Sequence, residues 1–152
     1  MAMWNGAAWA ALGAGLDAIV YDMTFVANGD LIVVGNFDFV PAGIAVDKIA
    51  RWTPATATWA AIGAGCNGIP YAIERLLASN IVYMAGAQTI VDGGVTVNGI
   101  NKLDTSTDTY TALEGGVAGG SPHSIAIDKN INLHIRGDFT TVDGITCTGY
   151  GK

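Results

Sequence analysis

One seven-residue motif recurs along the chain and limits the folds open to it. It reads Trp-Ala-Ala-Leu-Gly-Ala-Gly at 9–15, returns with Ile for Leu at 59–65, and returns in altered form at 110–116. The intervals are about 50 residues, a period typical of repeated supersecondary units. The part of the chain after residue 109 is shorter than a full repeat, and residues 1–8 have the length to complete it. We therefore divide the single domain 1–152 into repeats 9–58, 59–109 and 110–152, the last completed by 1–8.

Each repeat predicts four short strands, because segments rich in β-branched and aromatic residues alternate with turn signals such as Asn28-Gly29-Asp30. The strands predicted in repeat one are 18–26, 31–37, 47–52 and 59–62, with a loop at 38–46. Those predicted in repeat two are 70–77, 81–87, 99–104 and 110–113. Those predicted for repeat three are 122–128 and 131–139, joined by 2–4 and 9–12 from the start of the chain. Residues 71–78 have helical propensity, but their repeat equivalents predict a strand.

Four antiparallel strands per repeat of this length are typical of the blades of a β-propeller. Blades pack on both faces, and the second strand of each of the first two repeats is accordingly apolar throughout. A composition of 51% hydrophobic and 13% charged residues with 21 glycines fits such an all-β protein. The aromatic residues expected to wedge between blades, rather than to stack on sugars, are Trp4, Trp9, Trp52, Trp59 and Tyr110.

The repeat resembles a known group. Trp9, Leu12, Gly13 and Gly15 are followed by Val20-Tyr21, then by Gly35 and Phe37, then by Ile49, Ala50 and Trp52. This order is similar to the propeller repeats of many bacterial surface and phage-encoded proteins. The resemblance covers essentially the whole chain, although Ala87-Gln88 replaces Asn36-Phe37 in repeat two and repeat three departs at Tyr110, Glu114 and His123. It implies a fold and a virion or extracellular location, but no particular function.

Three blades cannot close a ring, since propellers typically have four to eight. We expect a head-to-tail homodimer in which the last two strands of one chain pair with the first two of the other. Two of the six blades are then composite, and the ring closes by two-fold symmetry. A trimer would need nine blades. The alternative is that the sequence is a piece of a longer protein.

Charge and composition exclude several classes of partner. The net charge is −6, and the seven basic residues form no patch, which argues against nucleic acid. No apolar run is long enough to span a bilayer, so we expect no membrane insertion, and no signal peptide is visible. Cys66 and Cys147 occupy unequal repeat positions, which predicts two free thiols rather than a disulfide. We expect no cofactor.

The candidate ligand-binding residues lie where a propeller presents its loops. Asp17 and Asn67 fall at the blade crossings, and Asp38, Asp92 and Asp143 fall in the long loops. Repeated carboxylates suit calcium or sugar hydroxyls, but Asp-Gly is also ordinary turn chemistry, and we favour the turn. We expect no metal site, because the spacing matches no EF-hand loop.

A few residues could carry catalysis. Asp22 and Glu74 fall on first strands and could act as an acid/base pair on a glycoside, or line a wet channel and pair with Arg75 or Arg136. His123, a ligand candidate that replaces Tyr21 and Tyr71 at one repeat position, and His134 are expected to be packed rather than to bind metal. No nucleophile elbow or phosphate loop is present.

These patterns favour a non-enzymatic structural or adhesive propeller module that assembles with itself. A lectin with glycan pockets between blades is the alternative, and a glycoside-active enzyme is a distant third. The residues do not name a ligand.

Overall fold

The computed structural model describes residues 1–147 and shows an all-β protein built from antiparallel sheets. Two sheets have four strands each, as the repeat predicts. Sheet I contains β3 (Ile19–Phe25), β4 (Leu31–Asn36), β7 (Ile49–Thr53) and β8 (Thr58–Ala61), in that order. Sheet II repeats the order with β9 (Pro70–Arg75), β10 (Ile81–Gly86), β13 (Ile100–Asp104) and β14 (Thr109–Ala112). The segment with helical propensity is therefore a strand as far as Arg75.

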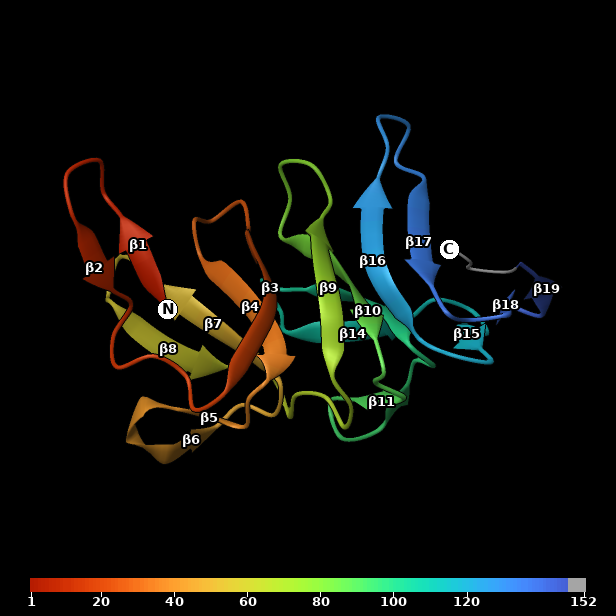
Figure 1. Cartoon of the computed structure of the whole chain (residues 1–152), viewed down its shortest axis with the longest axis horizontal. Helices are drawn as coiled ribbons and strands as arrows, with labels where there is room; N and C mark the ends of the chain where they lie inside the picture. The colour runs from red at the N-terminus through yellow and green to blue at the C-terminus, as the bar shows by residue number, and fades with distance from the viewer. Residues whose placement is uncertain (148–152) are drawn as a thin grey trace.

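Two further pairs of strands are half-sheets. The N-terminal half-sheet pairs β1 (Ala2–Trp4) with β2 (Trp9–Ala11), and the C-terminal half-sheet pairs β16 (Pro122–Ile127) with β17 (Leu133–Gly137). They lie at opposite ends of a row with sheets I and II between them (Figure 1). The described residues form no closed ring. The last five residues of the predicted third repeat, 148–152, lie outside the described part of the chain.

The prediction of a loop at 38–46 is wrong in detail. This segment contains two short strands, one before and one after a 3-10 turn. Its Val and Ile residues pair across the turn, and the corresponding loops of the other repeats do the same. These short elements are β5 (Phe39–Val40), η1 (Pro41–Gly43), β6 (Ile44–Ala45), β11 (Ile90–Val91), β12 (Val95–Thr96), β15 (Val117–Ala118), β18 (Thr141–Val142) and β19 (Ile145–Thr146). In Figure 1, β5, β6 and β11 lie beneath sheets I and II, and β15, β18 and β19 lie beside the C-terminal half-sheet.

The core lies between the sheets, because neighbouring sheets bury the faces that they turn toward one another. Ile32 and Val34 on β4 pack against Val82 and Met84 on β10 between sheets I and II, and Leu103 on β13 is fully buried there. The opposite face of β4 packs on Trp52 and Trp59 toward the N-terminal half-sheet. A third cluster lies between sheet II and the C-terminal half-sheet. Strands that are apolar on both sides follow from this stacking.

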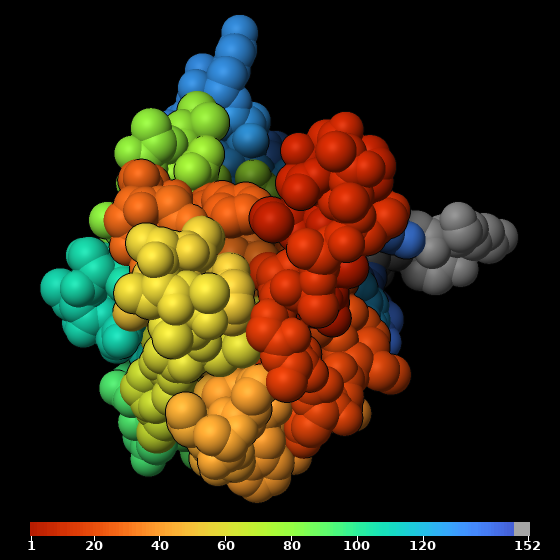
Figure 2. All heavy atoms as spheres, turned by 90° about the vertical axis from the view of Figure 1, so that its left-hand side faces the viewer, coloured from red at the N-terminus to blue at the C-terminus, as the bar shows by residue number. Residues whose placement is uncertain are grey.

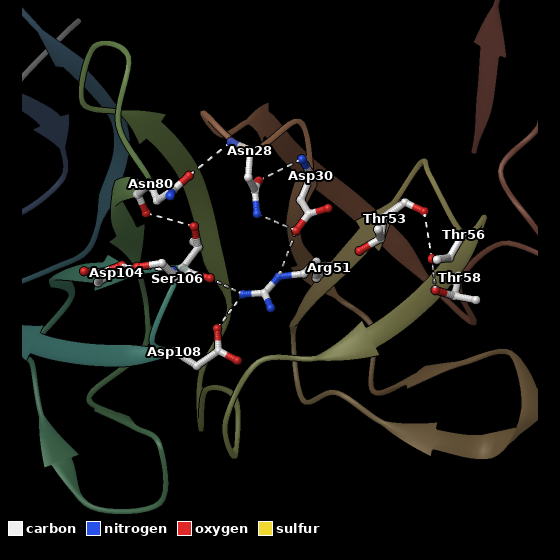
Figure 3. Close-up of polar contacts among 11 residues, drawn as sticks. Asn28, Asp30, Arg51, Thr53, Thr56, Thr58, Asn80, Asp104, Ser106 and Asp108 are labelled. Carbon is white, nitrogen blue, oxygen red and sulfur yellow. Dashed lines mark hydrogen bonds and ion pairs between the residues drawn. The ribbon is translucent and has the colours of Figure 1, made fainter.

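A polar cluster joins sheets I and II at the edge opposite the short loop strands (Figure 3). Arg51 on β7 donates to the carbonyl oxygen of Thr105 at 2.6 Å and forms an ion pair with Asp108. The side chain of Asn80 accepts from the backbone N–H of Asn28 at 3.2 Å, and its carbonyl oxygen accepts from Thr105. A charge-assisted bond from a half-buried guanidinium contributes more than a surface ion pair. This cluster fixes how the two sheets meet.

We predict that Leu103→Ala destabilises the protein by about 2–5 kcal/mol, because it leaves a cavity in the core between sheets I and II. Leu77→Ala is the matched control, since Leu77 is 70% exposed and should change stability by less than about 0.5 kcal/mol. Urea unfolding followed by tryptophan fluorescence measures both. Equal losses for the two variants would contradict the described packing.

Candidate functional site

Two of the predicted ligand residues, Asp17 and Asn67, hold the short loop strands in place. Oδ1 of Asp17 accepts from the backbone N–H groups of Asp38 and Phe39, both at 3.1 Å. Oδ1 of Asn67 accepts from the equivalent groups of Thr89 and Ile90, both at 2.9 Å. The same side-chain cap is thus used in two repeats, which is a structural role for the blade-crossing positions.

Asp92 and Asp143 also share one role. Oδ1 of Asp92 accepts from the N–H of Ala64 at 3.0 Å, and Oδ1 of Asp143 accepts from that of Gly115 at 3.1 Å. Both residues have left-handed backbone angles, with φ of 50° and 48°, which Asp tolerates better than most residues. Asp38 forms an exposed ion pair with Lys48 at 2.7 Å. The structure does not bring these carboxylates together, and no group of three or more metal-ligating side chains occurs within residues 1–147.

An aromatic row crosses three sheets on their first strands. Tyr21 on β3, Tyr71 on β9 and His123 on β16 each occupy the residue that a β-bulge leaves unpaired. The ring centroids of Tyr21 and Tyr71 are 5.6 Å apart, and those of Tyr71 and His123 are 5.0 Å apart. A bulge re-aims a side chain out of the regular alternation of a strand, and here it does so three times in line. Tyr21 and His123 are exposed and Tyr71 is half-buried, so the row presents aromatic surface to solvent.

Acidic groups flank the histidines. Asp138 lies 3.3 Å from Nε2 of His123, and its pKa is lowered by the hydrogen bond from the N–H of Ser121 and, to a lesser extent, by His123. Asp128 lies 3.4 Å from Nε2 of His134, and hydrogen bonds from Asn132 lower the pKa of Asp128 to about 2. The expectation of packing is wrong for His134, whose side chain is 65% exposed, because β17 has no sheet on that face. His123 is also exposed, and its ring lies against that of Tyr71.

The two carboxylates considered as an acid/base pair are at different register positions. Asp22 pairs opposite Val34 and Glu74 opposite Tyr83. Oδ2 of Asp22 accepts from the N–H of Ile73 at 2.9 Å and so links β3 to β9. Neither carboxylate forms an ion pair with Arg75 or Arg136 among the described residues. Asp22 is therefore a structural acceptor between two first strands.

The predicted aromatic wedges fall into two sets with one geometry. Trp52 and Trp59 pair at 5.1 Å and 53° and are each only 8% exposed. Trp4 and Trp9 pair at 5.6 Å and 52°, yet they are 52% and 70% exposed. Figure 2 looks onto this end of the row, where the N-terminal half-sheet lies beside β7 and β8. The same wedge is thus covered in sheet I and uncovered in the N-terminal half-sheet.

Two covered wedges, Trp59 and Tyr110, each donate to a carbonyl of the preceding repeat, which the sequence alone did not reveal. Nε1 of Trp59 donates to the carbonyl oxygen of Leu12 at 3.2 Å, and the hydroxyl of Tyr110 donates to that of Ile62 at 3.0 Å. Burial raises the pKa of Tyr110, which keeps the hydroxyl protonated as a donor. The signal available in the sequence was the fixed spacing between the aromatic residue and the Leu or Ile three positions later.

Both cysteines are free, as predicted. Cys66 is buried beside Val91 in the core between sheets I and II, and burial raises the pKa of its thiol to about 12. Cys147 is only half-buried.

Comparison with known proteins supports the fold alone. No protein-family model matches the chain, and no curated protein matches it. A solved structure, the extracellular domain of a putative one-component system from B. thetaiotaomicron, superposes with a TM-score of 0.53 at 15% sequence identity over 83% of this chain. This chain spans only 15% of the length of that one. The described residues contain no helix able to cross a bilayer.

We predict that iodoacetamide at pH 8 modifies Cys147 and leaves Cys66 unmodified in the folded protein. The thiolate is the reactive form, and a raised pKa together with burial suppresses it at Cys66. Mass spectrometry of tryptic peptides measures the labelling, and urea-unfolded protein, in which both thiols should react, is the control. Rapid labelling of Cys66 under native conditions would contradict the packing between sheets I and II.

Proposed function

We propose that the chain is a non-enzymatic β-propeller module, structural or adhesive in role, that forms half of a six-bladed ring with a second copy. Sheets I and II are complete blades. The observation that carries the proposal is the complementarity of the two ends. The N-terminal half-sheet corresponds to β7–β8 of a blade, and the C-terminal half-sheet corresponds to β3–β4.

The uncovered surface supports association. Met23 and Phe25 on β3 are 54% and 56% exposed. With Leu31 and Trp52 they line an apolar hollow of about 210 Å³ against β1. A contiguous apolar surface of this kind marks an interaction site. In a six-bladed ring it would be covered by the C-terminal half-sheet of the second copy.

A role without catalysis is supported by what the carboxylates do. Asp17, Asp92 and Asp143 accept backbone hydrogen bonds that shape loops, and Asp22 links two strands. The sequence resemblance to surface and phage-encoded propellers and the structural likeness to part of an extracellular domain both favour a surface or virion location. A stable closed ring that presents exposed loops is suited to adhesion or to scaffolding.

Carbohydrate binding is a second candidate, and the aromatic row favours it. Tyr21, Tyr71 and His123 offer adjacent ring surfaces beside the polar groups of Asp138 and Ser121. Aromatic surfaces edged by hydrogen-bonding groups are typical of sites for small polar ligands. Ring closure would continue the row around the axis.

We predict that light scattering gives twice the chain mass of 15.6 kDa for the intact chain and the single mass after removal of residues 1–8. The deletion removes β1 (Ala2–Trp4), one of the four strands of each composite blade and the strand that would pair with the second copy. Ala7→Ser, in the exposed turn between β1 and β2, is the control and should stay dimeric. A stable monomer of the intact chain at micromolar concentration would overturn the proposal.

We predict that a glycan array gives hits that Tyr71→Ala abolishes, because this substitution breaks the aromatic row at its centre. Phe39→Ala is the matched control, since Phe39 is exposed on β5, away from the row. An array without hits removes the carbohydrate candidate and leaves the structural role standing. Hits that both variants retain would place the sugar elsewhere.

A further inference from the structure

The internal repeats show how one unit packs on the next, and they can therefore specify the contacts that the open ends would make. The first two strands of each repeat align through one glycine: Val20 pairs with Gly35, Pro70 with Gly86 and Pro122 with Gly137. A Cβ at any of the three glycines would come within 2.3 Å of a backbone oxygen, so the close approach fixes the register. Leu31, Val82 and Leu133 are then equivalent positions on β4, β10 and β17.

The second and third strands of the two complete sheets share a register as well. Leu31 pairs with Trp52 between β4 and β7, and Val82 pairs with Leu103 between β10 and β13. Trp52 in turn pairs with Trp59, just as Trp4 pairs with Trp9 in the N-terminal half-sheet. Trp4 is thus the residue that belongs opposite Leu133.

We propose that β1 of one copy pairs antiparallel with β17 of a second copy, with Trp4 opposite Leu133 and Ala2 opposite Ile135. This rests on the ring put forward as the proposed function and names its partner surface. Ala50 opposite Val33 and Asn101 opposite Met84 are the pairs within the chain that Ala2 and Ile135 reproduce. The free edge of β17 gains its missing hydrogen-bond partners in this way.

The hydrogen bond from a wedge aromatic to a carbonyl oxygen of the preceding repeat, called here the wedge bond, extends to the second copy in the same manner. Leu12, Ile62 and Leu113 are equivalent, and their carbonyl oxygens accept from the N–H of Gly15, Gly65 and Gly116 at 3.3, 3.3 and 3.1 Å. The first two also accept from the wedges Trp59 and Tyr110. Among the described residues the carbonyl oxygen of Leu113 has no such aromatic donor, and the indole of Trp9 is uncovered. Nε1 of Trp9 therefore donates to the carbonyl oxygen of Leu113 in the second copy.

Two side chains oppose a tight contact and limit its strength. Glu114 stands where Gly13 and Gly63 stand, and a Cβ at those glycines would come within 3.3 Å of the wedge rings of Trp59 and Tyr110. Glu114 also has a left-handed φ of 46°. Arg136 occupies the position of Val34 and Ala85, and its guanidinium must reach solvent along the interface rather than be buried. Both features make the interface weaker than the contact between sheets I and II.

Cysteine cross-linking tests the register. Chains that carry Ala2→Cys and Ile135→Cys, with Cys147→Ser to remove the accessible thiol, should form a covalent dimer under mild oxidation, because directly opposed residues on paired strands are within disulfide reach. Met3→Cys with Ile135→Cys is the matched control and should not cross-link, since Met3 projects from the opposite face of β1.

The outcomes separate the register from the ring. A dimer by mass that cross-links through Met3→Cys instead would overturn the register and keep the ring. A covalently closed monomer would overturn both, because the two half-sheets of one chain would then meet. A monomer without cross-links would remove the proposed function itself.

Trp9→Phe tests the wedge bond. It keeps an aromatic side chain and removes the donor, and we expect the dissociation constant of the dimer to rise about 30-fold, because the two-fold ring loses two hydrogen bonds of about 1 kcal/mol each. Trp4→Phe is the control, because Trp52, its equivalent, makes no indole hydrogen bond among the described residues. Sedimentation equilibrium measures the dissociation constant of each variant. Equal changes for the two variants would overturn the assigned bond.

Discussion

The structure depends on one repeated contact, the covering of a wedge aromatic by the outer strand of the preceding repeat. Trp59 reaches back to the carbonyl of Leu12, and Tyr110 reaches back to that of Ile62. The hydrogen bond itself contributes about 1 kcal/mol, so burial of the ring supplies the larger part of the stabilisation. The bond fixes where the ring lies, and Trp and Tyr serve equally because each has one donor at the end of an apolar ring. The glycines after each carbonyl keep this space open.

Two-sided burial explains why the row cannot end without leaving apolar surface. Sheet II is covered by sheet I on one face and by the C-terminal half-sheet on the other. At the first end of the row, Met23, Phe25, Trp4 and Trp9 are exposed, whereas Trp52 and Trp59, the equivalents of Trp4 and Trp9, are buried. At the other end, the repeat has changed: Ser124, His134 and Arg136 stand on the outer face of the C-terminal half-sheet and are exposed. One end is therefore more apolar than the surface proposed to cover it.

The sequence predicts the repeat, the strand order and the covered faces, because these depend on periodicity and on apolar runs that single residues do not disturb. It does not predict what depends on geometry across repeats. The three bulges that align Tyr21, Tyr71 and His123 and the carbonyl partners of the wedges arise from backbone positions with no composition signal. The sequence shows that Gln88 replaces Phe37 in repeat two, but it does not show that Gln88 pairs with Asn101. Its Nε2 donates to Oδ1 of Asn101 at 3.3 Å inside the core, and Oε1 of Gln88 has no partner among residues 1–147.

Two departures from the repeat, Glu114 and Arg136, lie in repeat three at the open end of the row. Glu114 replaces a glycine beside the expected place of a wedge, and Arg136 replaces an apolar residue on a face that is buried in sheets I and II. Within the chain, the same contacts are formed by glycine and by Val34 or Ala85, and they are close-packed. A crowded Cβ and a charge that must reach water both raise the free energy of the closed state. In the proposed dimer, the interface would use the apolar wedges of one end and accommodate Glu114 and Arg136 at the other. It would be held by the same contact as the core, with less free energy, and would open before sheets I and II separate.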